Sequence, residues 1–153
     1  MNRKLFAASQ MRGSCDFPNI KGRVTFQQTP RGVIVTADIC GLPEVEDCSG
    51  VFAFHIHDGR CCTGNETDPF ADAGTHYDPC GHPHPYHAGD LPPLFASDGR
   101  AYMSVLTNRF TVDEIIGKTV IIHSQPDDFT TQPSGNAGEK IACGVICSDS
   151  RFN

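Results

Sequence analysis

Short runs in which apolar and polar residues alternate recur along the chain, and turn-forming residues separate each run from the next. Alternation with a period of two places successive side chains on opposite faces of a strand. We therefore predict strands at 4–9, 20–28, 32–39, 51–58, 100–106, 118–124 and 140–146. Helical periodicity is almost absent. One capping-box-like start, Thr111-Val112-Asp113-Glu114, predicts a short helical turn that ends at Gly117.

Two long stretches, 59–93 and 126–138, show no sustained period and are expected to be loops. Loops of this length are uncommon in a small domain and usually carry function. Seven or eight short strands with regular turns and two such loops predict an all-β fold, a Greek-key antiparallel barrel or sandwich. The length of 153 residues predicts that 1–153 is a single domain with a proper core.

The strand expected at 51–58 contains Phe54-His55-Ile56-His57. Because residues two apart on a strand share a face, His55 and His57 present two imidazoles side by side. Neutral imidazoles held on a rigid strand suit zinc, copper, nickel or iron. Five more histidines lie downstream. Four of them crowd into the first long loop and are followed there by Asp90: His76, His82, His84 and His87. The fifth, His123, lies beyond the loop. The pattern indicates a metal protein.

Composition narrows the function classes further. The net charge of −6, with no cluster of lysine and arginine, argues against a nucleic-acid partner. No apolar run is long enough to span a membrane. The first ten residues lack the apolar stretch of a signal peptide, which makes the cytoplasm the default compartment.

The cysteine content points toward a different compartment. Eight cysteines without any Cys-x2-Cys spacing favour disulfides over a zinc ribbon. Disulfides are typical of oxidising compartments. Since the first residues favour the cytoplasm and the cysteines a disulfide-permissive environment, the sequence leaves the compartment open.

Five motifs follow one another along the chain in a recognisable order: Phe54-His55-Ile56-His57, Gly74-Thr75-His76-Tyr77-Asp78-Pro79, His87-Ala88-Gly89-Asp90-Leu91-Pro92, Val120-Ile121-Ile122-His123, and Gly135-Asn136-Ala137-Gly138 with Ala142-Cys143-Gly144-Val145-Ile146. Together they resemble the copper/zinc superoxide dismutase family over about residues 20–146. The run 87–92 is more similar to the bacterial branch of that family than to the animal branch.

The resemblance implies two metal ions per chain, one copper and one zinc. It places copper on His55, His57, His76 and His123. His76 would also reach zinc through its second ring nitrogen, together with His87, Asp90 and one further histidine. The family spacing of eight from the bridging histidine favours His84, with His82 as the alternative.

The resemblance also implies three supporting roles. Asp127, four residues after His123, would bridge a copper histidine and a zinc histidine and so fix their orientation. Lys140 would guide the anionic substrate, in the place where the family has arginine; lysine attracts an anion but lacks the planar fork of arginine. The family disulfide would join Cys62 to Cys143, with Cys61 as the alternative first partner.

The remaining cysteines are expected to pair across neighbouring segments: Cys61 with Cys80, Cys40 with Cys48, and Cys15 with Cys147.

The resemblance thus implies a superoxide dismutase in which His76 releases copper on reduction, takes up a proton and delivers it to the peroxide. The expected partner is the superoxide anion, together with a second copy of the chain in a homodimer; neither nucleic acid nor membrane is expected. The alternative is a copper-binding or copper-delivery protein of the same fold without turnover. Lys140 in place of arginine and the altered loops motivate that alternative.

Overall fold

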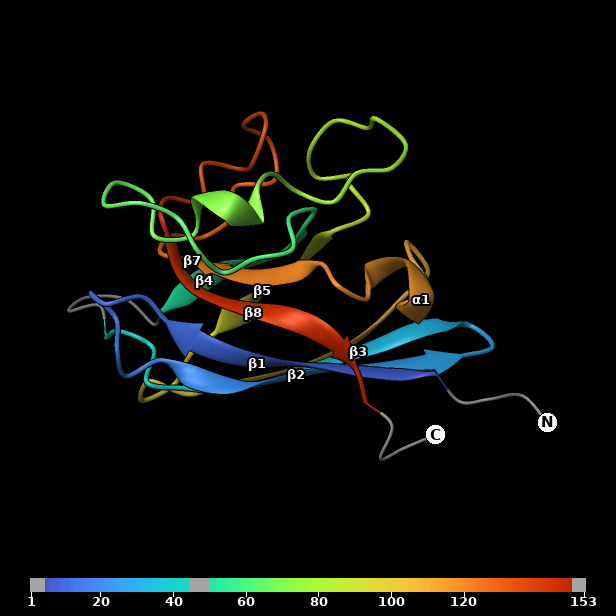
Figure 1. Cartoon of the computed structure of the whole chain (residues 1–153), viewed down its shortest axis with the longest axis horizontal. Coiled ribbons are helices and arrows are strands. Elements are labelled where there is room, and N and C mark those ends of the chain that lie inside the picture. Colours follow the sequence, from blue (N-terminus) through green and yellow to red (C-terminus); the bar gives the residue numbers. More distant parts are fainter. Residues whose placement is uncertain (1–4, 45–49, 150–153) are drawn as a thin grey trace.

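The strands form one antiparallel sheet that curls into a nearly closed barrel (Figure 1). The computed structural model describes residues 5–44 and 50–149. Within these ranges there are eight strands, a 3-10 turn and one short helix: β1 (Phe6–Gly13), β2 (Lys21–Thr29), β3 (Gly32–Cys40), β4 (Val51–His57), η1 (Ala71–Ala73), β5 (Asp90–Phe95), β6 (Ala101–Thr107), α1 (Val112–Ile115), β7 (Thr119–His123) and β8 (Lys140–Ser148).

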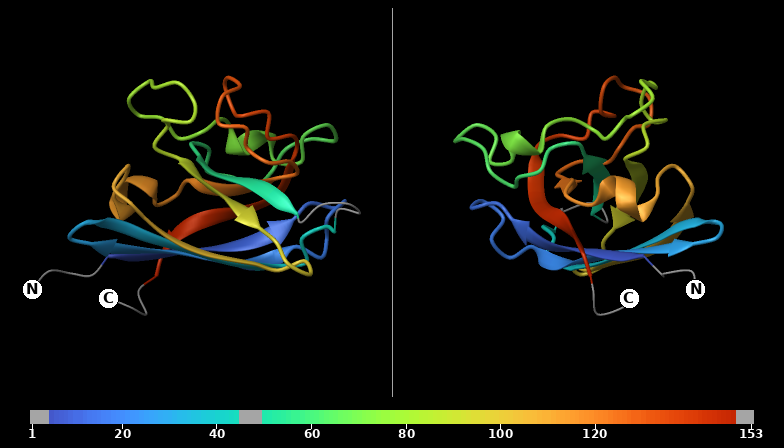
Figure 2. Two further views of the ribbon diagram at one scale, coloured as in Figure 1. Left: turned by 180° about the vertical axis from the view of Figure 1, so that it is seen from behind. Right: turned by 45° about the vertical axis from the view of Figure 1, so that its right-hand side comes forward.

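The strand order β5-β4-β7-β8-β1-β2-β3-β6 confirms the Greek-key prediction, because β3 to β4 and β6 to β7 are joined by long crossovers. Figure 2 shows a layer of β1, β2, β3 and β6 facing a layer of β4, β5, β7 and β8. The two end strands, β5 and β6, are joined by a tight turn in which Ser97 and Arg100 exchange backbone hydrogen bonds of 2.7 and 3.0 Å.

The core lies between these layers and explains the alternation in β4. Phe52, Phe54 and Ile56 are fully buried among core residues of the facing strands, such as Phe26. The other face of β4 therefore points away from the core and toward the loops. Those loops bury His55 on the outer side of the barrel.

The prediction of one unbroken loop from 59 to 93 is wrong, because β5 begins at Asp90. Pro92 and Pro93 hide this strand in the sequence, since proline cannot donate to a sheet ladder and usually excludes a central strand. Among the described strands, β5 is an end strand that pairs with β4 alone, so missing N–H groups are tolerated there.

The first strand was also misplaced. It runs from Phe6 to Gly13 rather than from 4 to 9, and residue 4 lies outside the described part of the chain. Its inward positions are Ala7, Ser9 and Met11. A buried serine in the middle of this set breaks the apolar alternation that marks the other strands.

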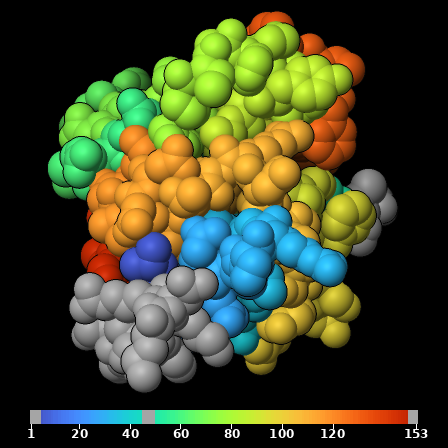
Figure 3. All heavy atoms as spheres, turned by 90° about the vertical axis from the view of Figure 1, so that its right-hand side faces the viewer, coloured from blue at the N-terminus to red at the C-terminus, as the bar shows by residue number. Residues whose placement is uncertain are grey.

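The short helical turn was predicted correctly. The backbone N–H of Thr111 donates to the Glu114 carboxylate at 2.6 Å, and Gly117 takes a φ of 86° just after the helix. No helix in the described ranges is long and apolar enough to cross a membrane. Figure 3 shows the two long loops, green to yellow-green and orange-red, side by side at one end of the molecule.

Candidate metal centre

Four histidines converge beneath the long loops, and all of them are buried: His55, His57, His76 and His123. Each offers one ring nitrogen, and these nitrogens lie within 4.8 Å of one another. The strand register explains the convergence. β4 pairs with β7, which ends at His123, and an isolated bridge joins His57 to His76 from the loop. The histidines expected to hold copper are thus brought together.

Hydrogen bonds fix which nitrogen of each ring faces the centre of this cluster. His57 donates from Nδ1 to the Gly74 carbonyl at 2.8 Å, and His123 donates from Nδ1 to the Gly138 carbonyl at 3.3 Å. Their Nε2 atoms then face each other at 3.3 Å. Because both rings carry their proton on Nδ1, neither Nε2 can donate a hydrogen bond to the other. A cation between the two Nε2 atoms therefore fits.

Unsatisfied buried nitrogens provide a direct test of metal fit. Within the described residues, four side-chain nitrogens are buried without a hydrogen-bond partner. One is Arg23 Nε on β2, and the other three are His55 Nδ1, His76 Nε2 and His84 Nδ1. Burying such groups is costly unless something compensates them. These three histidine nitrogens all belong to the clustered rings. A metal ion that binds nitrogen would therefore compensate for their missing hydrogen bonds.

A second cluster shares His76 and comprises His76, His84, His87 and Asp90. One Asp90 oxygen lies 2.7 Å from His76 Nδ1, and the other lies 3.1 Å from His84 Nδ1 and 3.2 Å from His87 Nδ1. Three nitrogens and one carboxylate around a buried point form a donor set suited to tetrahedral zinc. His76 thus turns Nε2 toward the first cluster and Nδ1 toward the second.

The structure separates the two histidines that the sequence left as alternatives. His84 is 2% exposed and belongs to the second cluster. His82 is exposed, and its backbone N–H donates to Asp78. His82 is not among the clustered residues. This geometry favours His84 as the third histidine of the second cluster.

Asp127 connects the two clusters from behind. One of its oxygens accepts a hydrogen bond from His55 Nε2 at 2.7 Å, and the other accepts one from His84 Nε2 at 2.8 Å. The backbone N–H of Phe129 also donates to Asp127 at 2.8 Å. A carboxylate in this position fixes the tautomer of both rings, so that Nδ1 of His55 and Nδ1 of His84 face their clusters without a proton.

The electrostatics of the site favour neutral imidazoles and ionised carboxylates. Burial lowers the pKa of His55 to about 4 and that of His123 to about 3, and it holds the pKa of His57 well below its usual value. Burial alone would raise the pKa of Asp127, but hydrogen bonds from His55 and His84 outweigh it and leave this pKa well below its ordinary value. These are the protonation states that metal binding requires.

The first cluster opens into a cavity of about 850 Å³, which is lined by His57, His76, His123 and Lys140 among others. His87 of the second cluster also lines this cavity, whereas His84 is 2% exposed and does not. Lys140, which was expected to guide the substrate, forms part of the wall of this cavity. Its ammonium group is not free, because it lies 2.6 Å from an Asp68 carboxylate oxygen and 3.4 Å from the Phe70 carbonyl.

The predicted bridge between Cys62 and Cys143 is confirmed, with Cα atoms 5.7 Å apart. It ties the first long loop to β8. Cys61, the alternative partner, is an exposed free thiol.

The structure contradicts two of the other three predicted disulfides. Cys61 and Cys80 are both exposed free thiols, so their pairing is wrong. The pairing of Cys15 with Cys147 is also wrong: Cys147 lies opposite Ala8, whereas Cys15 lies beyond the far end of β1. At about 3.3 Å per residue that separation exceeds the reach of a disulfide. The pairing of Cys40 with Cys48 involves a residue outside the described ranges.

Two residues, Gln132 and Arg109, support the site without having been singled out in the sequence. Gln132 holds His84 on both sides: its side chain accepts from the His84 N–H at 2.9 Å and donates to the His84 carbonyl at 2.7 Å. Arg109 donates to three carbonyls of the same loop at 2.9 to 3.2 Å. Neither lies in a periodic or motif-like context, so the sequence offers no signal for them.

Gly135 supports the site by leaving space. A Cβ atom there would lie 2.0 Å from an Asp127 oxygen and 2.6 Å from His84 Nε2, and the φ of 73° is one that side chains rarely adopt. Its motif was noticed in the sequence, but its approach to Asp127 depends on how the second loop folds back on itself, and its approach to His84 depends on how that loop packs against the first.

Comparisons with known proteins agree with this geometry. A family described as copper/zinc superoxide dismutase (SODC) matches residues 20–146. The superoxide dismutase [Cu-Zn] of Legionella pneumophila is 40% identical over 133 residues, covering 82% of this chain and 76% of the relative. That of Deinococcus radiodurans is 33% identical over 145 residues, covering 83% and 77%. The solved structure of Cu/Zn superoxide dismutase from Brucella abortus superposes with a TM-score of 0.77 at 28% identity, covering 92% of this chain and 98% of that one.

Proposed function

The chain belongs to the copper/zinc superoxide dismutase family, and from this premise we propose which of its residues perform each part of the reaction. It is a superoxide dismutase that uses copper and zinc. The reaction turns two superoxide anions and two protons into dioxygen and hydrogen peroxide. The protein must therefore accept an anion, exchange one electron at a time and supply protons.

Copper is assigned to the first cluster. Two observations support this assignment. Ring nitrogens of all four histidines converge there, and two of these nitrogens, His55 Nδ1 and His76 Nε2, have no hydrogen-bond partner. Copper bound there would supply the one-electron chemistry that the reaction needs. Three of the four imidazoles lie on the rigid strands β4 and β7, and together with His76 they would hold copper beside the cavity, where a small anion could reach it.

His76 is assigned the proton transfer, and its position between the clusters is the observation that carries the proposal. Its Nδ1 faces the second cluster, whose Asp90 oxygen lies 2.7 Å away. Its Nε2 faces the first cluster and the cavity. When Nε2 is not bound to metal it takes up a proton, and it gives that proton to the reduced dioxygen species in the cavity.

Zinc is assigned to the second cluster, where His84, His87 and Asp90 complete the set around His76 Nδ1. Zinc held there would keep the His76 ring in one orientation, with Nε2 directed toward the first cluster. Asp127 accepts hydrogen bonds from His55 of the first cluster and from His84 of the second. The buried carboxylate therefore couples the geometry of the two metal sites.

Lys140 is assigned the attraction of superoxide to the cavity. Among the residues that line the cavity it is the one lysine or arginine. Charge-guided association is slowed by salt, because ions screen the attraction. We therefore expect the rate at saturating copper to fall with ionic strength; an unchanged rate would contradict this steering role.

The rival function is a copper carrier of the same fold without turnover, and the contact between Lys140 and Asp68 is the observation in its favour. One experiment separates the two functions. Metal content of the purified protein is measured alongside superoxide consumption, before and after copper loading. We expect consumption to rise with copper occupancy. Full copper occupancy without consumption would favour the carrier.

We also propose a homodimer formed through the end strands of the barrel. Phe95 on β5 and Tyr102 and Leu106 on β6 are 68%, 73% and 52% exposed. Exposed aromatic and aliphatic side chains gathered at one place are typical of a protein interface. A second copy related by a two-fold axis would cover this surface on both chains. Sedimentation velocity should give a dimer for the native protein and a monomer for Leu106→Glu; a native monomer would contradict the proposal.

A further inference from the structure

The cation at the cavity entrance is engaged by a carboxylate that is itself held in place. Lys140 begins β8, and its Nζ lies 2.6 Å from Asp68 Oδ2. The other oxygen of Asp68 accepts the backbone N–H of Phe70 at 3.0 Å, and the backbone N–H of Asp68 donates to Asn65 at 3.0 Å. The Cys62–Cys143 bridge ties the same loop to β8, three residues beyond Lys140.

The pair is partly sheltered from water. The Lys140 side chain is 15% exposed and that of Asp68 is 38% exposed. Lys140 keeps the pKa of Asp68 below its usual value, although burial acts in the opposite direction. Asp68 is thus ionised at neutral pH and cancels part of the field of Lys140.

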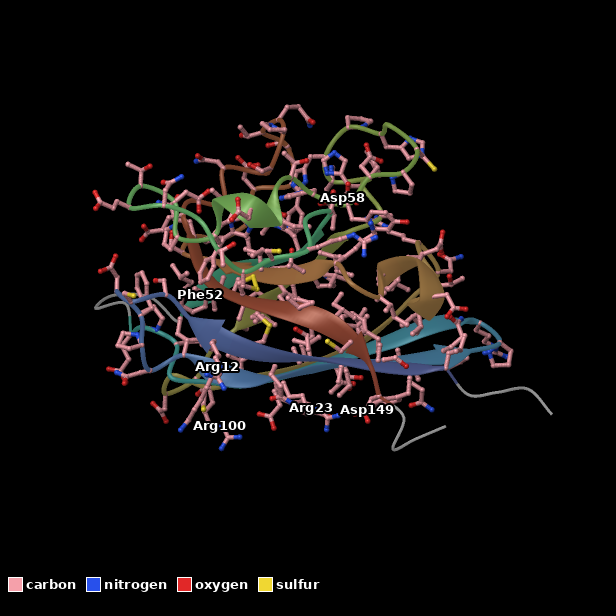
Figure 4. All side chains as sticks on the ribbon, viewed as in Figure 1. Arg12, Arg23, Phe52, Asp58, Arg100 and Asp149 are labelled. Atoms are coloured by element: carbon pink, nitrogen blue, oxygen red, sulfur yellow. A yellow bond between two sulfur atoms is a disulfide. The ribbon has the colours of Figure 1, made fainter. Side chains whose placement is uncertain are left out.

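The rest of the cavity wall does not compensate for this cancellation. Besides Asp68 it carries Asp58, Asp78 and Glu139, and Lys140 is its one lysine or arginine. Asp58 in turn holds Lys118 at 2.5 Å. Figure 4 shows Arg12, Arg23 and Arg100 below the sheet, on the side away from the loops, whereas Asp58 lies among the loops.

We propose that Asp68 is a positioning residue that holds Lys140 at the rim and limits the rate at which the cavity attracts superoxide. An incoming superoxide must compete with the Asp68 carboxylate for the same ammonium group. This inference rests on the proposed function of the cavity and concerns how the substrate reaches it. The proposal concerns the pair formed by Lys140 and Asp68 in this chain, and it holds whichever metal occupies the second cluster.

The substitution Asp68→Asn tests the proposal, because it removes the negative charge and keeps a side chain of the same size. We expect kcat/KM for superoxide at low salt to rise roughly two- to fivefold and to fall more steeply with ionic strength than in the native enzyme. The affinity of azide, an anion that reports on copper through its absorption, should rise by a similar factor. Equal metal content and an unchanged circular dichroism spectrum establish that the variant is folded.

Two matched controls separate the pair from a general effect of charge. Asp78→Asn and Glu139→Gln each remove one negative charge from the same cavity wall, and within the described residues the ion pair of Lys140 is with Asp68 rather than with either of these carboxylates. We expect both to change the rate and the azide affinity less than Asp68→Asn does. An equal gain in the controls would overturn the proposal.

A double substitution completes the test. In a Lys140→Gln background, Asp68→Asn should have no more effect than the controls, because the ammonium group it releases is gone. A full gain in that background, or a loss of rate in Asp68→Asn alone, would also overturn the proposal. A native protein that binds copper but consumes no superoxide would refute the proposed function instead, and azide affinity would still report on the pair.

Discussion

Asp127→Asn is the substitution that tests the coupling between the two metal sites most sharply. The native carboxylate accepts three hydrogen bonds, from His55, His84 and the Phe129 N–H. An asparagine has the same shape but offers one oxygen and one NH2 group. Only one of the two histidine rings can then keep a carbonyl partner.

The arrangement of donors indicates which ring loses its partner. The oxygen that accepts from His84 also accepts from Phe129, so the asparagine carbonyl satisfies two donors when it occupies that position. Its NH2 group then faces Nε2 of His55. Two donors cannot pair, so His55 must move its proton to Nδ1, the nitrogen proposed to bind copper. We therefore expect copper binding to suffer more than zinc binding.

The magnitude follows from comparable outer carboxylates, whose loss weakens metal binding about 10- to 100-fold. That range corresponds to about 1.4–2.7 kcal/mol. Competition with a chelator of known affinity measures both metals in the purified variant. Asp128→Asn is the matched control: Asp128 is adjacent and exposed, and its carboxylate accepts hydrogen bonds from Thr130 and Thr131 rather than from histidine. Copper affinity within twofold of the native value, or a larger loss of zinc than of copper, would refute this reasoning.

Three further predictions concern individual histidines. His123→Ala should abolish superoxide consumption and leave the circular dichroism spectrum unchanged, because it removes one copper nitrogen at the end of β7; native turnover would mean that copper binds elsewhere. His84→Ala should lower the zinc content measured by mass spectrometry, whereas His82→Ala should not; the reverse result would exchange their roles. In the metal-free protein, burial lowers the pKa of His55 from 6.5 to about 4, so the unfolded chain binds this proton more readily between those values. The free energy of unfolding measured in urea should be highest above pH 6.5 and decline toward pH 4, and a constant value over that window would contradict the prediction.

The sequence predicted which histidines lie close together better than it predicted the edges of the fold. His55 and His57 were recognisable because a strand alternates with a period of two and because Phe54 and Ile56 mark the opposite face as core. The end strand β5 was missed because its two prolines are tolerated only where a strand has a single neighbour, and that depends on the order of strands in the sheet.

Contacts between loops were the least predictable features. Which carboxylate would engage Lys140, and how Gln132 and Arg109 would fasten the loop around His84, depends on loop packing that leaves no periodic trace. The same limit applies to the disulfides. Cys62 and Cys143 were paired through a family resemblance, whereas the pairing of Cys15 with Cys147 failed because strand register, which the sequence does not specify, sets their separation.

The central claim is that one residue, His76, binds both metals. Its most direct test is electron paramagnetic resonance of the protein with Cu²⁺ in the first cluster and Co²⁺ in the second. If the two nitrogens of one imidazole join the ions, the ions are magnetically coupled, and the copper signal should disappear as cobalt is added to one equivalent. A copper signal that keeps its intensity and shape at full cobalt occupancy would contradict the shared ligand.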